Sequence, residues 1–173
     1  RLIRSISNKP IYVDANQGWP TKEHALKMCQ WLAEQGVVLI EQPMPKHMNE
    51  EHAWLCERVE LPIIADEACQ TYADVAGLQP YYDGINIKLM KCGGVAEARK
   101  MIALARELGM QVMIGCMTET SAGISAATTL SPLVDYADLD GYVLIANDPY
   151  EGIQIVDGKL TLVDKPGTGV TVR

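Results

Sequence analysis

Residues 84–115, GINIKLMKCGGVAEARKMIALARELGMQVMIG, contain two short apolar runs with one amphipathic helical pattern between them. The runs GINIKLMK and QVMIG have the length and the Ile and Val content typical of buried strands. Six apolar residues of the central segment share one helical face: Val95, Ala98, Met101, Ile102, Ala105 and Leu108. Gly109 then marks the end of that helix. A strand, a helix and a second strand in this order predict two parallel strands joined by a crossover helix.

The same alternation runs along the whole chain. Its apolar runs are IYVDAN, VVLIEQP, LPIIADE, GINIKLMK, QVMIGCMTE and YADLDGYVLI. Amphipathic patterns lie between them, such as TKEHALKMCQWLAEQG, which opens at Thr21 as an N-cap and stops at Gly36. Polar residues end the strands at a near-even spacing of roughly 25 residues, which favours a (β/α) barrel over a doubly wound sheet.

We therefore expect an α/β protein with an incomplete barrel of the TIM type. Six βα units are visible, whereas a closed barrel has eight, so we interpret the visible strands as barrel strands 3 to 8. The first residues, RLIRSISNKP, read as the second half of a helix and indicate a piece of a longer protein. We assign residues 1–150 to the partial barrel and residues 151–173 to a turn-rich, hairpin-like C-terminal extension.

The composition narrows the choice of partners and compartment. The chain has 173 residues, 48% of them hydrophobic, and a net charge of −7, which argues against a nucleic-acid or anionic-membrane partner. No apolar run approaches the ~20 residues that span a bilayer. The five cysteines form no CxxC pair, so we expect buried, reduced thiols in a cytoplasmic protein rather than a zinc site. The sequence is compatible with both a monomer and a homo-oligomer.

The alternation of side chains along each strand indicates which residues point into the barrel. In IYVDAN, Asp14 and Asn16 share a face opposite the apolar residues that must meet the helices. The same test turns Glu41 and Asp66 inward. Three carboxylates at neighbouring strand ends would repel one another, and a hard cation, Mg²⁺ or Mn²⁺, would remove that conflict. The alternative for each acid is a helix cap or a solvated position at the rim.

The fourth strand carries the candidate base. Asn86 and Lys88 face inward by the same alternation, whereas Lys91 lies past the strand, where we expect a solvated loop residue. We expect burial and a nearby dication to lower the pKa of Lys88 toward ~7–8, the range that suits a general base. The histidines all fall in predicted helices or loops, which excludes a histidine base at the strand ends: His24, His47 and His52.

Further acids surround this predicted site. YADLDGY places Asp138 and Asp140 on one face, where they could hold a substrate cation such as an ammonium group. The alternative is an acidic strand end that leads to a turn at Gly141. Glu119 either lines the pocket or caps the following helix. Three residues are further candidates for the pocket or its immediate surroundings: Asn16, Glu67 and Asn86.

The motifs VDANQGW, IEQPMP, IIADEA, INIKLMKCGG and DLDG, in this order, resemble the C-terminal barrel of the enolase superfamily. The resemblance is to the muconate-lactonizing branch, and within it most to the dipeptide epimerases, including the alanyl-glutamate epimerases. It covers essentially the whole chain. It implies that Asp14, Glu41 and Asp66 bind Mg²⁺ and that Lys88 is an acid/base catalyst. It also implies that Asp138 and Asp140 hold the α-ammonium group of a dipeptide.

The reaction that this resemblance implies is Mg²⁺-dependent epimerisation of a dipeptide by 1,1-proton transfer through a metal-stabilised enediolate. One lysine then acts on each face of the substrate, the second from a KxK motif on the second barrel strand. Neither that motif nor the family's N-terminal α+β capping domain occurs in this sequence, so we expect both in a preceding part of the protein.

Two alternatives to the epimerase remain. The nearest is other chemistry of the same branch, as in succinylbenzoate synthases or muconate cycloisomerases. An alternative of another class is a non-catalytic barrel fragment that acts as a binding or structural module.

Overall fold

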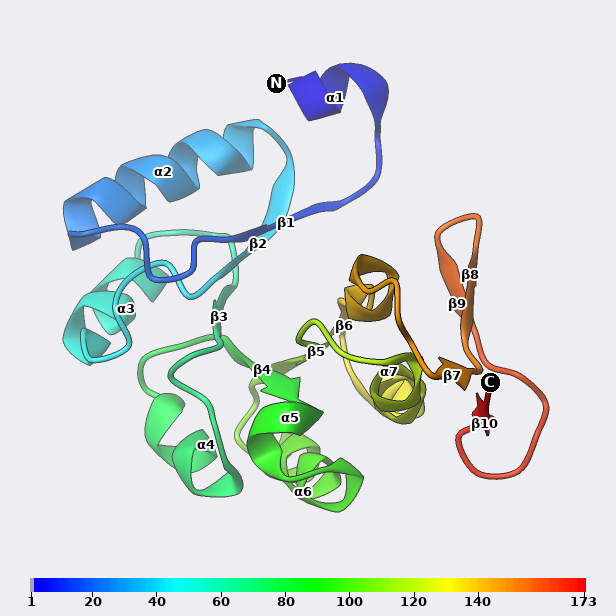
Figure 1. Ribbon diagram of the computed structural model, residues 1–173. Coiled ribbons are helices and arrows are strands. Elements are labelled where there is room, and N and C mark those ends of the chain that lie inside the picture. The colour runs from blue at the N-terminus through cyan, green and yellow to red at the C-terminus, as the bar shows by residue number, and fades with distance from the viewer. Residues whose placement is uncertain (1) are drawn as a thin grey trace.

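The computed structural model describes residues 2–173 and is built on a six-stranded parallel sheet. The strands are β1 (Ile11–Asp14), β2 (Val37–Glu41), β3 (Ile63–Ala65), β4 (Gly84–Lys88), β5 (Gln111–Gly115) and β6 (Tyr136–Ala137). Each strand pairs with the next one in chain order, from β1 to β6, without a reversal. Figure 1 shows the strands at the centre with the helices arranged around their outer side. This curled half-barrel confirms the predicted incomplete α/β barrel of the TIM type.

The helices follow the strands in the predicted alternation. They are α1 (Leu2–Ile6), α2 (Lys22–Glu34), α3 (Asn49–Cys56), α4 (Tyr72–Leu78), α5 (Leu89–Cys92), α6 (Val95–Glu107) and α7 (Ser121–Thr128). Single 3₁₀ turns cover Ser131–Leu133 and Gly141–Leu144. At the start of α2 the Thr21 hydroxyl accepts a hydrogen bond of 3.2 Å from the His24 amide, and Gly36 follows the helix with a φ of +74°. Both predicted ends of this helix are therefore confirmed.

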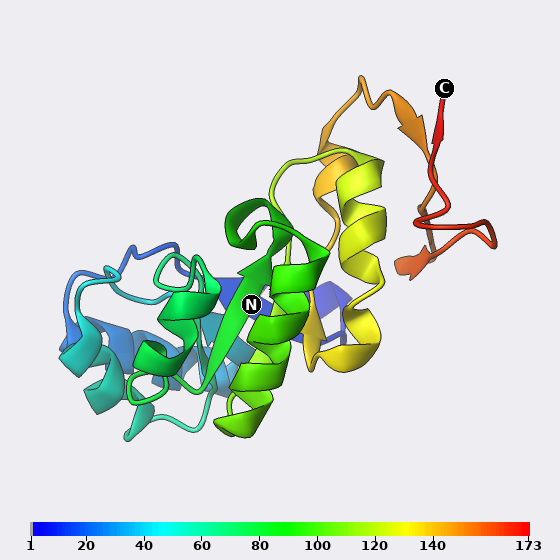
Figure 2. The same cartoon turned by 90° about the horizontal axis from the view of Figure 1, so that it is seen from below.

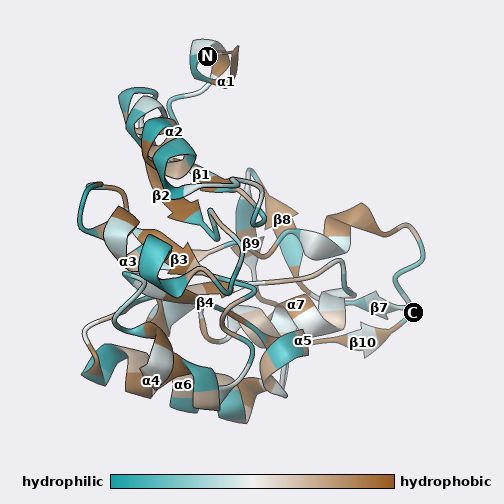
Figure 3. Ribbon diagram, turned by 90° about the vertical axis from the view of Figure 1, so that its left-hand side faces the viewer, coloured by the Kyte–Doolittle hydropathy of each residue, from teal (hydrophilic) through white to brown (hydrophobic). Residues whose placement is uncertain are grey.

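The main core lies between the sheet and the helices. Helix α6 buries Ala98, Met101, Ile102 and Ala105, which are four of the six residues predicted for its inner face. Figure 3 shows hydrophobic residues on strands β2 and β3, while the helices carry hydrophilic residues on part of their surface. The 3.6-residue period of these helices thus determines which side packs on the sheet.

A second, smaller cluster fills the concave side of the sheet. It consists of Leu39, Ile64 and Met113, with Tyr136 packed against them. The rings of Tyr12 and Tyr136 meet edge to face with centroids 5.6 Å apart, so they join β1 to β6 across the half-barrel. Leu39 and Ile64 precede Glu41 and Asp66 by two positions, as expected if these acids point to the same concave side.

Two aspartates secure the amino ends of the strands, opposite the predicted site. Asp83 accepts a hydrogen bond of 2.8 Å from the amide of Ile63 at the start of β3. Asp135 accepts one of 2.8 Å from Val112 in β5 and also pairs with Arg106 at the end of α6. These hydrogen bonds satisfy backbone amides where the chain enters the strands. The predicted site residues lie at the opposite, carboxyl ends of the strands.

The end of the chain forms two small two-stranded sheets. Strands β7 (Tyr150–Glu151) and β10 (Thr171–Val172) pair antiparallel, and β8 (Gln154–Val156) forms a hairpin with β9 (Lys159–Thr161). The hairpin turns at Asp157 and Gly158, both with positive φ, as a two-residue turn of this kind requires. Figure 2 shows this segment, in orange to red, at one end of the molecule, with its start next to α7.

The predicted strand over residues 136–145 is too long. Strand β6 ends at Ala137, and the chain turns into a 3₁₀ helix at Gly141. There the backbone passes so close to the loop after β5 that a Cβ on Gly141 would lie 2.0 Å from the carbonyl oxygen of Met117. This close approach is a tertiary contact, and the local sequence pattern does not reveal it.

Two broader expectations can also be compared with the structure. All five cysteines are free thiols, and Cys29, Cys69 and Cys92 are buried. Within residues 2–173, no helix has both the length and the apolar character needed to cross a membrane.

Candidate active site

Three carboxylates meet at the carboxyl ends of the first three strands. Asp14 and Glu41 are the last residues of β1 and β2, and Asp66 directly follows β3. One oxygen from each of the three lies within 4.8 Å of the others. Glu41 and Asp66 are buried, whereas Asp14 is exposed. The alternation of side chains therefore placed all three acids on the correct side of the sheet.

The crowding of these acids has an electrostatic cost. Burial, together with the nearby charges of Asp66 and Asp14, raises the pKa of Glu41 to about 7. Three hard oxygen donors at this separation match the ligands that Mg²⁺ takes in proteins, and a dication would offset their repulsion. The residues present therefore fit a magnesium ion.

The side chain of Asn86, on β4, contacts the carboxylate of Glu41 directly. Its Nδ2 donates a hydrogen bond of 2.6 Å to Oε1 of Glu41, and its Oδ1 has no partner among residues 2–173. A Cβ on Gly115 of the neighbouring strand β5 would lie 2.6 Å from the Asn86 amide, so glycine makes room for it. The predicted inward direction of Asn86 is confirmed, and the structure adds its contact with Glu41.

Lys88, the last residue of β4, reaches two of the acids. Its Nζ lies 2.7 Å from Oδ2 of Asp66 and 3.9 Å from Oε1 of Glu41, and its side chain is only 12% exposed. Burial alone would lower the pKa of Lys88, but the hydrogen bond and charge of Asp66 outweigh it and raise that pKa. In this metal-free arrangement two carboxylates beside the ammonium stabilise its charged form. The lowering expected beside a bound dication stays a prediction.

The prediction that Lys91 is a solvated loop residue is wrong. It lies in α5, the single helical turn that follows Lys88, and its side chain is 8% exposed. Its Nζ donates hydrogen bonds of 2.5 Å to Oδ1 of Asp66 and 2.8 Å to the Asp66 carbonyl. Burial would raise the pKa of Asp66, but hydrogen bonds from Lys88 and Lys91 hold it below its usual value.

Sequence reasoning also missed Gln42, which follows Glu41. This fully buried residue has a φ of +32° and uses its whole carboxamide. Its Oε1 accepts from the amides of Asp66 and Ala68 at 3.0 and 3.1 Å. Its Nε2 donates to the Met44 carbonyl at 3.1 Å and to the Tyr82 hydroxyl at 2.9 Å. A glutamine within an otherwise buried run was the available signal, because buried amides are normally fully hydrogen-bonded.

A cavity of about 210 Å³ is lined by Asp14, Glu41 and Lys88. Asp138 and Asp140 line it together with Asp14 and Lys88, and Leu139 between the two aspartates is buried in the opposite direction. Burial and the charge of Asp140 raise the pKa of Asp138. The remaining lining residues come mostly from the loop after β5 and from the turn after Asp140: Asn86, Gly115, Cys116, Met117, Thr118, Gly141 and Leu144.

Three other candidate residues lie outside this cavity lining. Asn16 is in a turn with a φ of +45°. Its backbone amide, not its side chain, donates a hydrogen bond of 2.8 Å to Oδ1 of Asp14. The Oε2 of Glu67 is buried without a partner among residues 2–173. Glu119 folds back on its own loop, where its Oε1 accepts from the Met117 amide at 3.1 Å and its Oε2 lies against Gly123 of α7. Glu119 thus lies against α7, but among residues 2–173 its carboxylate accepts no hydrogen bond from an amide of that helix, so neither predicted position is observed.

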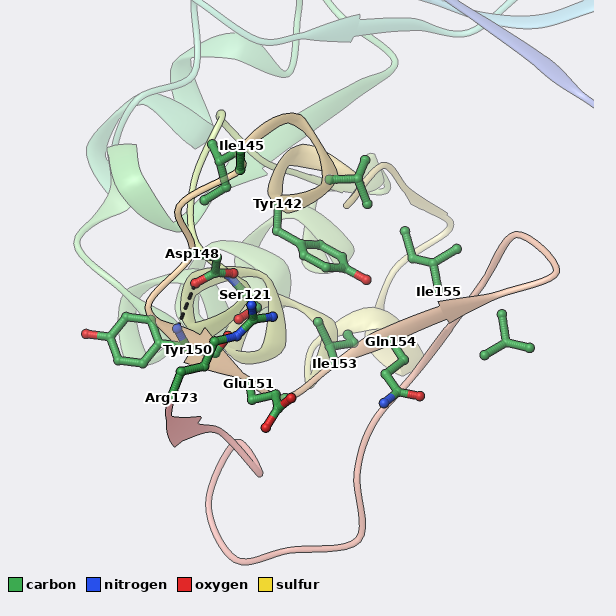
Figure 4. Close-up of a pocket in the computed structure, with 14 residues that line it drawn as sticks. Ser121, Tyr142, Ile145, Asp148, Tyr150, Glu151, Ile153, Gln154, Ile155 and Arg173 are labelled. Atoms are coloured by element: carbon green, nitrogen blue, oxygen red, sulfur yellow. Dashed lines mark hydrogen bonds between the residues drawn. The ribbon is translucent and has the colours of Figure 1, made fainter.

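A larger hollow, of about 550 Å³, lies in the C-terminal segment (Figure 4). There Asp148 accepts hydrogen bonds from the amides of Ser121 and Tyr150 at 2.7 and 3.1 Å, so its carboxylate holds the start of α7. This hollow shares no lining residue with the smaller cavity. Asp14, Glu41 and Lys88 line the smaller cavity and not the larger hollow, so the smaller cavity is the candidate site.

Comparisons with known proteins agree with this geometry. Residues 1–173 match the family described as enolase C-terminal domain-like. An L-Ala-D/L-Glu epimerase from Bacteroides thetaiotaomicron is 56% identical over 168 residues, a match that covers 97% of this chain and 44% of that protein. An L-Ala-D/L-amino acid epimerase from Pedosphaera parvula is 47% identical, over 99% of this chain and 50% of that protein. The chain thus spans about half the length of the curated relatives it matches.

Solved structures of dipeptide epimerases also match this chain, again over about half of their length. The L-Ala-D/L-Glu epimerase from Bacillus subtilis, in a complex with substrate, superposes with a TM-score of 0.88 at 31% identity, covering 96% of this chain and 48% of that one. A dipeptide epimerase from Enterococcus faecalis, in complex with Mg and the dipeptide L-Leu-L-Tyr, superposes with a TM-score of 0.90 at 34% identity. That match covers 98% of this chain and 50% of the other.

Proposed function

The chain belongs to the enolase C-terminal domain-like family, and from this premise we propose that it forms the catalytic barrel of a Mg²⁺-dependent dipeptide epimerase. The main support for the proposal is that three carboxylates and one lysine lie close together at the carboxyl ends of the strands. Three carboxylate oxygens lie within 4.8 Å of one another, and Lys88 lies 2.7 Å from one of those acids. Residues 1–150 would be the partial barrel and residues 151–173 its extension. A capping domain and the first two barrel strands would belong to the rest of the protein.

Asp14, Glu41 and Asp66 would hold the magnesium ion. When bound, Mg²⁺ would act as a Lewis acid on the substrate carboxylate and offset the negative charge that raises the pKa of Lys88. Mn²⁺ accepts the same oxygen ligands and would serve as a substitute. Asn86 would keep Glu41 turned toward the ion through its hydrogen bond of 2.6 Å.

Lys88 would transfer the proton at the α-carbon on one face of the substrate. Lys88 lines the cavity, its side chain is largely buried, and Asp66 and Glu41 fix the position of its Nζ. Epimerisation requires that a proton leaves one face and another returns to the opposite face. The second acid/base group would be a lysine from a part of the protein outside residues 1–173.

Asp138 and Asp140 would hold the α-ammonium group of the dipeptide. Both line the cavity that contains Lys88, and they add negative charge beyond the three acids of the metal site. A carboxylate pair attracts an ammonium group and repels a second carboxylate, so it favours a substrate with a free amino terminus. Succinylbenzoate synthase and cycloisomerase substrates carry no such ammonium, which makes these reactions the weaker alternative.

The proposal can be tested with the full-length protein in D₂O containing Mg²⁺ and a panel of dipeptides. We expect mass spectrometry to detect one deuterium at the α-carbon of the epimerised product of the accepted dipeptides, and no epimerised product when Lys88→Met replaces the wild type. Chelation of the metal should stop the exchange. Absence of exchange in every dipeptide would reject the function.

A further inference from the structure

The two lysines of the IKLMK motif bind the two oxygens of a single carboxylate. Lys88 meets Oδ2 of Asp66 at 2.7 Å, and Lys91 meets Oδ1 at 2.5 Å. Lys91 also donates to the main-chain carbonyl of Asp66 at 2.8 Å. Both hydrogen bonds of Lys91 therefore go to one residue.

The local backbone explains how Lys91 reaches this position. Helix α5 begins directly after Lys88, and its single turn brings Lys91 back over the strand ends. Gly93 and Gly94 follow with φ values of +91° and +110°. A Cβ on either glycine would meet no atom within 4 Å, so packing does not demand glycine there. The pair instead permits the left-handed backbone that ends this turn and starts α6.

Lys91 is separated from the space that a substrate would occupy. Lys88 lines the cavity of about 210 Å³, whereas Lys91 is not among its lining residues. Its side chain is 8% exposed, and that of Asp66 is 6% exposed. A buried ammonium is costly unless it is paired and hydrogen-bonded, so its place in the fold depends on Asp66.

We infer that Lys91 is a positioning residue that orients Asp66, and this inference rests on the proposed metal site. Lys91 holds Oδ1 and the carbonyl, which leaves Oδ2 to Lys88, a residue that lines the cavity. Gln42 accepts hydrogen bonds from the backbone amides of Asp66 and Ala68. The Asp66 carboxylate thus has one orientation before a cation arrives, and metal binding need not order it.

Positioning and simple charge predict opposite effects for the loss of Lys91. An ammonium near a metal site repels a dication, so by charge alone its removal should strengthen metal binding. If Lys91 orients Asp66, its removal should weaken metal binding, because the carboxylate loses its fixed direction. Changes around directly ligating residues typically alter metal affinity by about 10–100-fold.

The test uses Mn²⁺ as the probe in the metal-free, full-length protein, followed by calorimetry and by the electron paramagnetic resonance spectrum of the bound ion. We expect Lys91→Met to weaken Mn²⁺ binding at least about tenfold and to broaden the spectrum. The matched control Lys100→Met, at an exposed lysine of α6, should stay within about twofold of the wild type. If Lys91→Met does not fold, Lys91→Gln is judged by the same criterion.

Activity at saturating metal separates positioning from catalysis. Because Lys91 touches no substrate space, kcat of Lys91→Met should return to within about threefold of the wild type once Mn²⁺ saturates the site. Mn²⁺ binding equal to or tighter than that of the wild type would overturn the inference, and so would a large loss of kcat at saturation. A wild-type protein that binds no Mn²⁺ would instead reject the proposed metal site itself.

Discussion

The Nδ2 atom of Asn86 donates a hydrogen bond of 2.6 Å to Oε1 of Glu41. The two residues lie on β4 and β2, which are separated by β3, so the bond crosses the concave side of the sheet. It joins the acid with the raised pKa to a residue that is 1% exposed. One side of the proposed metal site is therefore built on the interior of the half-barrel.

We expect Asn86→Ala to lower the free energy of unfolding of the metal-free protein by about 1–3 kcal/mol, because a buried carboxylate loses its donor. Urea denaturation in the presence of a chelator measures this. Asn147→Ala, at an exposed asparagine, is the control and should change the value by less than about 0.5 kcal/mol. A loss no larger than that of the control would show that the bond to Glu41 adds nothing to stability.

The raised pKa of Glu41 predicts how stability depends on pH. Its carboxyl has a reference pKa of 4.5 and a value of about 7 in the folded protein, beside Asp66, Asp14 and Lys88. Between these values the folded protein keeps a proton that the unfolded chain loses, so the contribution of Glu41 to the unfolding free energy falls as pH rises.

Replacing Glu41 with Gln removes this contribution. Without metal, the stability of Glu41→Gln relative to the wild type should rise by on the order of 1–3 kcal/mol between about pH 5 and pH 7.5. Denaturant titrations at the two pH values test it, with exposed Glu34→Gln as the control. A constant difference across this pH range would contradict the prediction.

We expect Asp138 and Asp140 to contribute to substrate binding and not to metal affinity. We expect Asp138→Asn and Asp140→Asn each to lower kcat/KM for dipeptides by at least about 30-fold, since each loses a charge that faces the substrate ammonium. Mn²⁺ affinity, measured by calorimetry, should stay within about threefold of the wild type. Unchanged dipeptide turnover in both variants would remove the ammonium-binding role.

Gln42 should be a large contributor to stability. Gln42→Leu leaves the amides of Asp66 and Ala68 without their acceptor and Tyr82 and Met44 without their donor. We expect a loss of about 3 kcal/mol or more in unfolding free energy, against a change within about 0.5 kcal/mol for exposed Gln30→Leu. Thermal unfolding with circular dichroism detection distinguishes the two variants, and similar midpoints would refute this role of Gln42.

The sequence by itself determined the architecture and the direction of the strand-end side chains. Apolar runs alternating with amphipathic helices specify a parallel sheet, and a period of two residues along a strand specifies which side chains face inward. Asp14, Glu41, Asp66 and Lys88 were found in this way. These patterns are local, because each depends only on the repeat of one helix or strand.

Only the tertiary structure decided how these groups are held. The bond from Asn86 to Glu41 spans strands that are not neighbours, Gln42 joins β2 to the loop after β3, and Lys91 turns back onto Asp66 through a single helical turn. The raised pKa of Lys88 has the same origin, since it depends on the distances to Asp66 and Glu41. Periodicity specifies the face on which a residue lies, whereas distances across a curved sheet follow from the packing of the whole half-barrel.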